Sequence, residues 1–265
     1  MTMLNYSPKI NNFAIINSLI LNDYQMIKKL LSLIIITTLF SCKDSNETKV
    51  DDEVKIETEE NADTELTEAQ KIANAYGYEN WKNVEEIDFA FNVQRNEGEP
   101  FKRSWTWNPN SGDVTMMTAT DTVSYNRNSM DSLSMKTDQS FINDKYWLLT
   151  PYQLVWDTGT TFSEPTKVKA PMDSLMMNKI TVTYGNEGGY TPGDAYDLYY
   201  GDDYKVKQWV YRKGNAGEPS MATTWENPET INGLTLVKDY NNPTSGTKIF
   251  FTDLDVKMKD SDDPK

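Results

Sequence analysis

Residues 138–156 read DQSFINDKYWLLTPYQLVW, and this stretch decides the fold because it places a helix inside a chain of short strands. Asp138 can cap the helix, and Pro151 is expected to end or kink it. Residues 152–156 predict a further short helical turn. The residues at helical spacing before Pro151 are Phe141, Ile142, Lys145, Tyr146 and Leu149.

The segments on both sides of this helix show the alternation that is typical of half-buried strands. In residues 87–93, for example, the odd-numbered residues from Ile87 to Val93 are apolar and share one face. Clusters of glycine, proline and asparagine separate such segments, as expected for turns. Ten strands are predicted, over residues 87–93, 101–107, 114–118, 122–125, 180–184, 195–200, 205–211, 221–225, 234–240 and 248–256.

The short connections between these strands indicate an antiparallel meander. Another helix is predicted to begin at Thr67 and to stop at Gly77. We therefore expect a mainly β (α+β) fold: a single antiparallel curled sheet or half-open β-barrel, with a helical lid and an N-terminal helix. The helices are expected to pack against the concave face of the sheet.

The composition changes abruptly before this domain, which is expected to occupy residues 67–260 and to be followed by a tail, 261–265. Residues 43–68 contain eleven acidic residues, three lysines and no aromatic residue. Such a segment cannot bury enough apolar surface to offset the entropy of ordering. Residues 42–66 are therefore predicted to be an acidic disordered tether, which its like charges extend.

Residues 26–42, MIKKLLSLIIITTLFSC, have the pattern of a secretory signal. The apolar run 30–40 is eleven residues long, which is too short to cross a hydrocarbon core of about 30 Å. Ser41 before Cys42, with Leu39 three positions ahead of it, resembles the lipobox of bacterial lipoproteins. The resemblance implies a lipoprotein signal peptide over 26–41 and lipidation at Cys42. A free thiol after an ordinary apolar segment is the alternative.

Residues 1–25 have no cluster of positive charge, whereas Lys28 and Lys29 follow directly after Met26. Signal peptides carry their positive charge near the amino terminus. Residues 1–25 are therefore interpreted as a non-translated extension; an amino-terminal helix that belongs to the fold is the alternative. The acidic segment after Cys42 also resembles the surface-export signals of Bacteroidota lipoproteins, although a plain solvated spacer has the same composition.

Charge limits the partners of the protein. The chain has 26 basic and 40 acidic residues, a net charge of -14. Nucleic acid is excluded as a ligand because phosphate binding needs a basic surface. The same negative charge disfavours attraction to anionic headgroups, so membrane attachment is expected through acyl chains on Cys42. We expect a monomer, lipid-anchored at the outer membrane or cell surface and facing the periplasm or the exterior.

The order of the predicted elements, with Trp81 and the motifs NDKYWLLTPY (143–152) and GDAYDLYY (193–200), resembles an uncharacterised family of Bacteroidota lipoproteins. The layout of that family is similar to the LolA/LolB-like carriers and receptors of lipoprotein sorting. In these, a half-open barrel has helices across its mouth. The resemblance implies a LolA/LolB-like β domain over 67–260, although the exposed apolar loop on which carrier-type receptors depend has no unambiguous counterpart.

Catalysis has few candidate residues. The chain has no histidine, which excludes histidine bases, Ser-His-Asp triads and histidine metal sites. With Cys42 acylated, no thiol nucleophile is left, and there is no calcium-binding loop motif. We expect no enzyme, no metal and no cofactor. A hydrolase with paired carboxylates remains a third hypothesis, with Asp194, Asp197, Asp202, Asp203, Asp253 and Asp255 as its candidates.

Aromatic residues and methionine are the richer signal. The chain has seven tryptophans, fifteen tyrosines and twelve methionines, and methionine often lines adaptable apolar sites. We expect a cavity for a lipid or acyl chain, or for a lipoprotein, between sheet and lid. An ordinary packed core is one alternative, and a surface glycan-binding lipoprotein with exposed aromatic rings is another. The candidate ligand-binding residues are Trp147, Trp156, Met176, Trp209 and Tyr211.

Overall fold

The computed structural model describes residues 65–187 and 190–260. The predicted extension 1–25, the signal peptide 26–41, Cys42, the tether up to residue 64 and the tail 261–265 lie outside these residues. Glu65 and Leu66, at the end of the predicted tether, are exposed and lie outside helices and strands.

The predicted amino-terminal helix is present as α2 (Glu68–Ala75), followed by the 3-10 helix η1 (Tyr78–Asn83). Thr67 caps α2, because its side chain accepts from the backbone of Gln70, whose own side chain bonds back to Thr67. Gly77 ends the helix with a φ of 85°. A Cβ at this position would lie 1.9 Å from the carbonyl oxygen of Gly233, so only glycine fits.

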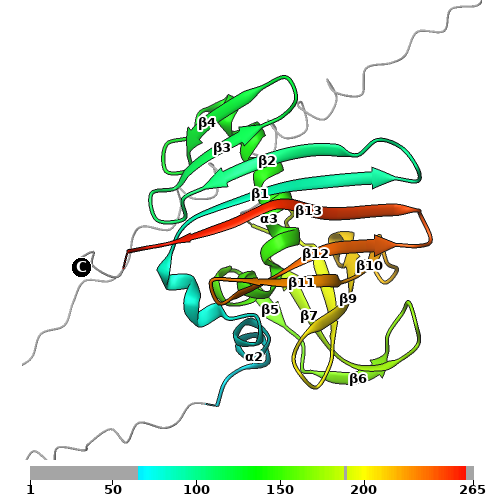
Figure 1. Ribbon diagram of the computed structural model, residues 1–265. Helices are drawn as coiled ribbons and strands as arrows, with labels where there is room; N and C mark the ends of the chain where they lie inside the picture. Colours follow the sequence, from blue (N-terminus) through cyan, green and yellow to red (C-terminus); the bar gives the residue numbers. More distant parts are fainter. Residues whose placement is uncertain (1–64, 188–189, 261–265) are drawn as a thin grey trace, which may run out of the picture. The chain divides into compact units, whose positions relative to one another are not determined.

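The strands form two antiparallel sheets (Figure 1). The seven-stranded sheet has the order β11-β12-β13-β1-β2-β3-β4, and the other has β10-β9-β8-β7-β5 with β6 paired to β7. The strands are β1 (Val84–Arg95), β2 (Phe101–Trp107), β3 (Asp113–Met117), β4 (Thr122–Asn126), β5 (Thr160–Phe162), β6 (Thr166–Lys169), β7 (Met176–Tyr184), β8 (Ala195–Tyr200), β9 (Val206–Arg212), β10 (Met221–Thr224), β11 (Glu226–Ile231), β12 (Leu234–Asn242) and β13 (Thr247–Met258), with the 3-10 turn η2 (Lys213–Asn215) after β9.

The predicted fold class is confirmed, since the domain is mainly β, antiparallel and has few helices. Its strands are divided between two hydrogen-bonded sheets, which approach each other where the Thr224 hydroxyl of β10 donates to the carbonyl of Asn241 in β12 at 3.4 Å. All ten predicted strands are present. Three more, β5, β6 and β11, were not predicted, because β5 and β6 span only three and four residues and β11 is a polar edge strand containing Pro228.

The helix α3 (Ser132–Trp156) packs between the two sheets (Figure 1). Phe141 contacts Trp105 and Trp107 of the seven-stranded sheet, with both pairs of ring centroids 5.4 Å apart. On another side, the ring of Trp147 lies 4.5 Å from that of Trp209 in β9. The central helix is therefore part of the core of the domain.

The predicted start of this helix is wrong. Asp131, seven residues before Asp138, is the cap, and it forms a capping box with Ser134. Asp138 is instead fully buried on the helix, where it accepts hydrogen bonds from Tyr125 and Arg127 at 2.9 Å. Both aspartates precede helix-forming residues, so local sequence alone does not separate a cap from a buried partner of an arginine.

Pro151 kinks the helix but does not end it. Leu149 has non-helical dihedral angles, and α3 continues to Trp156. Proline has no N–H to donate to the carbonyl four residues before it, which is that of Trp147. The hydroxyl of Tyr240, in β12, donates to this carbonyl at 2.6 Å. A tertiary hydrogen bond thus takes the place of the missing helical one.

Candidate functional site

A cavity of about 460 Å³ lies between α3 and the two sheets. Five of its lining residues belong to α3 and follow the spacing i, i+3, i+4, i+7 and i+8, which is one face of a helix. The lining comprises Gln139, Ile142, Asn143, Tyr146 and Trp147 from α3; Phe91, Val93, Arg95, Phe101, Arg103, Thr247 and Ile249 from the seven-stranded sheet; Tyr196, Trp209, Tyr211 and Met221 from the other; and Tyr190 and Thr191 from the segment before β8.

Three of the candidate residues predicted from the sequence meet at this cavity. Trp147 contacts Trp209, and Trp209 and Tyr211 lie on one face of β9 because they are two residues apart. Tyr196, from the neighbouring strand β8, stacks on both Trp209 and Tyr211 with centroid distances of 5.3 Å. These four rings form one wall of the cavity.

The other two ligand-binding candidates lie elsewhere. Trp156, at the end of α3, packs against Trp81 with ring centroids 4.7 Å apart and against Tyr152 at 6.1 Å. Met176 is the first residue of β7, where it pairs with Lys169 and is 55% exposed. Composition singled out these residues, but only the packing of the elements decides which aromatic and methionine side chains face one cavity.

One end of the cavity faces solvent. Arg95 and Phe101, at the end of β1 and the start of β2, are both exposed. Thr247 begins β13 directly opposite Arg95, and Phe101 lies opposite Val93. The mouth of the cavity therefore lies where the end of β1 meets the starts of β2 and β13.

Arg103 is fixed in the cavity wall by Asp144 of α3. Its Nε and Nη2 atoms each donate to one carboxylate oxygen of Asp144 at 2.7 Å. Asp144 is fully buried and also accepts from the indole of Trp105 at 2.9 Å. Burial raises the pKa of Asp144, and the hydrogen bonds from Arg103 oppose that shift. The pair therefore holds the guanidinium in one orientation and compensates its charge.

A second cavity of about 370 Å³ adjoins the first. Ile142, Tyr146, Tyr190 and Thr191 line both. The hydroxyl of Tyr190 donates to Asp138 at 2.9 Å, so Tyr190, which lies between the two cavities, is anchored to α3. Asp157 and Glu187 line the second cavity but not the first.

Lys145, a residue of α3 itself, is also buried. Its ammonium lies 5.4 Å from the ring centroids of both Trp107 and Trp156, and no carboxylate within the described ranges forms an ion pair with it. Burial lowers the pKa of Lys145 to about 8. The lysine lines neither cavity. Helical spacing alone does not predict that its ammonium group is removed from water.

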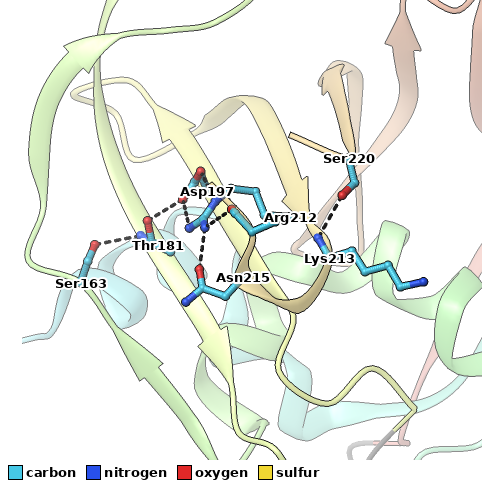
Figure 2. A network of polar contacts seen from close by, with 8 residues as sticks. Ser163, Thr181, Asp197, Arg212, Lys213, Asn215 and Ser220 are labelled. Carbon is cyan, nitrogen blue, oxygen red and sulfur yellow. Dashed lines mark hydrogen bonds and ion pairs between the residues drawn. The ribbon is translucent and has the colours of Figure 1, made fainter. Parts of the chain in front are cut away.

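The six candidate acids do not line either cavity. Asp194 accepts from the Tyr211 hydroxyl at 2.8 Å, and Asp197 accepts from Arg212 and from Thr181 (Figure 2). The others make local or surface contacts: Asp202 with Lys167, Asp203 with Lys207, Asp253 with Lys102, and Asp255 opposite Asp88 in the register of β1 and β13.

Neither a metal cluster nor a membrane-spanning helix is found within residues 65–187 and 190–260. No group of three or more acidic or cysteine side chains in these ranges lies close enough together to hold a metal ion. Likewise, none of the helices in this part of the chain combines the length and apolarity needed to cross a membrane.

No protein-family model and no curated protein matches this chain. Two solved structures share features of the fold. A LolA superfamily protein from Nitrosomonas europaea is 10% identical with a TM-score of 0.42, and the match covers 72% of this chain and 94% of that one. A DUF1329 family protein from Desulfovibrio piger is 10% identical with a TM-score of 0.38, covering 71% and 92%. These similarities concern the arrangement of elements alone.

Proposed function

We propose that the protein is a membrane-anchored lipoprotein that binds an apolar ligand between α3 and the sheets. The observation that carries this proposal is the cavity of about 460 Å³, because ligand sites typically measure about 300 to 1,000 Å³. Twelve of its eighteen lining residues are aliphatic or aromatic or are methionine. The free energy falls when an apolar molecule displaces water from such a surface.

Binding to surface glycans is less well supported. That function requires aromatic rings on open surface, yet every tryptophan and tyrosine in residues 65–187 and 190–260 is buried or half-buried. Catalysis by paired acids is also less well supported, since the six candidate aspartates lie away from both cavities. We therefore propose a binding protein and not an enzyme.

The proposal is tested by filling the cavity. Val93 is half-buried in β1 and lines the cavity, so Val93→Trp should occupy part of its volume. We expect the variant to bind the neutral apolar dye Nile red about tenfold more weakly than the wild-type chain, measured by fluorescence titration.

Val123→Trp is the matched control, because Val123 is a half-buried strand valine of the same sheet that lines neither cavity. Circular dichroism checks that both variants are folded. Equal dye affinity in both variants and the wild-type chain would contradict the proposal.

A further inference from the structure

We infer that the ligand of this cavity is a single-chain amphiphile whose anionic head binds at Arg95 and whose apolar chain lies inside. This inference rests on the proposed function, since it names the class of ligand for the same site. Three observations carry it: the charges that line the cavity, a guanidinium at its mouth that has no side-chain partner among the described residues, and the order of side chains from mouth to interior.

The charges at the cavity run against those of the whole chain. The protein has 40 acidic and 26 basic residues, yet among residues 65–187 and 190–260 the charged side chains that line this cavity are Arg95 and Arg103, with no aspartate or glutamate. An anion is repelled by most of such a protein but meets positive charge at the cavity. This local reversal of sign favours an anionic over a neutral or cationic ligand.

The two arginines differ in what their charge can do. Arg103 is neutralised by its two hydrogen bonds to the buried Asp144. Arg95 is exposed and forms no ion pair or side-chain hydrogen bond with any residue of the described ranges. A guanidinium presents paired N–H donors that match the oxygens of a carboxylate or phosphate. Arg95 is thus the group available to bind an anionic head.

The strands place this charge at the outer end of an apolar row. Phe91, Val93 and Arg95 alternate along β1 and share the face that lines the cavity. In the register with β13, Ile249 lies beside Val93 and Thr247 beside Arg95. Both strands therefore change from apolar side chains inside to polar ones at the mouth. An amphiphile matches this order when its chain enters first.

The volume favours a single chain. About 460 Å³ lies in the lower half of the size range of small-molecule sites. One chain makes better use of such a space than the two or three acyl chains carried by a bacterial lipoprotein. Fatty acids and single-chain lipid phosphates share the chemistry that this site requires.

The inference is tested with ligands that share one chain and differ in the head. Palmitate, hexadecyl phosphate and uncharged hexadecanol compete with Nile red for the full chain, and their dissociation constants are compared. We expect both anions to bind about five- to tenfold more tightly than hexadecanol. The preference should shrink in 0.5 M salt, where the Debye length is only a few ångströms. The tighter of the two anions then distinguishes a carboxylate from a phosphate ligand.

Variants connect the preference to its residue. Arg95→Gln should bring the ratio of hexadecanol to palmitate dissociation constants close to one, while Arg95→Lys should keep part of it. Lys136→Gln removes the same charge from an exposed position of α3 outside both cavities and should leave the ratio unchanged. A ratio near one in the wild-type chain, or an undiminished ratio in Arg95→Gln, would overturn the inference while apolar binding stands. Failure of Nile red and hexadecanol to bind the wild-type chain would overturn the proposed function as well.

Discussion

At the scale of single residues, burial decides the behaviour of groups that look alike in the sequence. Asp138 and Asp144 lie on the same helix, and each is buried with an arginine partner, Arg127 and Arg103 respectively. Lys145, next to Asp144, is buried near the rings of Trp107 and Trp156 and forms no ion pair with any residue that the structure describes. Burying the lysine charge therefore costs free energy. For the two aspartates, pairing with an arginine reduces the corresponding cost.

This difference predicts a pH dependence for Lys145. Its pKa is about 8 in the folded protein and near the ordinary value of about 10.4 when unfolded. Below pH 8 the lysine is charged in both states and burial destabilises the fold; from pH 8 towards 10 the unfolded chain holds more protons, so stability rises. Lys145→Met should therefore be more stable than wild type at pH 7, and the gain should shrink at pH 9.5.

Urea unfolding of both proteins at the two pH values measures this effect. Comparing variant with wild type at each pH removes the contribution of the tyrosines that both proteins share. Lys136→Met makes the same substitution at an exposed position of α3 and serves as the control for the loss of a lysine. A gain for Lys145→Met that is equal at pH 7 and pH 9.5 would count against a lowered pKa at this lysine.

At the scale of elements, α3 depends on β12 at its kink. Pro151 leaves the carbonyl of Trp147 without its helical donor, and the hydroxyl of Tyr240 donates to it. Tyr240 is fully buried, so no solvent can replace this hydrogen bond. The kink and the sheet residue beneath it therefore form one unit.

Tyr240→Phe is expected to destabilise the fold by about 1 to 3 kcal/mol, because it leaves a buried carbonyl without a donor. The loss should be smaller when Pro151→Ala is also present, since alanine restores the helical N–H. A double-mutant cycle followed by urea unfolding measures the coupling between the two positions. Additive effects of the two substitutions would show that the proline and the tyrosine act independently.

At the scale of the whole molecule, the anchoring proposed for Cys42 would hold the domain at a membrane. Acyl chains on Cys42 would provide membrane affinity that an acidic protein does not obtain from its charge. Cys42→Ala should abolish incorporation of radiolabelled palmitate and release the protein from the membrane fraction. Ser41→Ala keeps a small residue before the cysteine and should still be labelled. Labelling that persists in Cys42→Ala would place the acyl group elsewhere.

The sequence predicted much of the fold but only part of the site. Alternation and turn signals located ten of the thirteen described strands, because side chains of a half-buried strand differ in polarity between its two faces. It also placed Trp209 and Tyr211 on one face of β9. Arg95 could have been noticed as the polar end of the apolar row that begins at Ile87. The contribution of Tyr196 could not, since nothing local shows which strands become neighbours.

By itself, the sequence determined the mainly β class, the helix inserted among the strands and the absence of histidine chemistry, because these follow from local periodicity and composition. Only the tertiary structure decided where α3 begins, which of Trp147, Trp156, Met176, Trp209 and Tyr211 meet at one cavity, and which arginine of the lining has no ion-pair partner among the described residues. These depend on contacts between residues far apart in the chain, such as Arg103 with Asp144 and Tyr240 with Trp147. Register and packing create such contacts, and neither is written in any one segment.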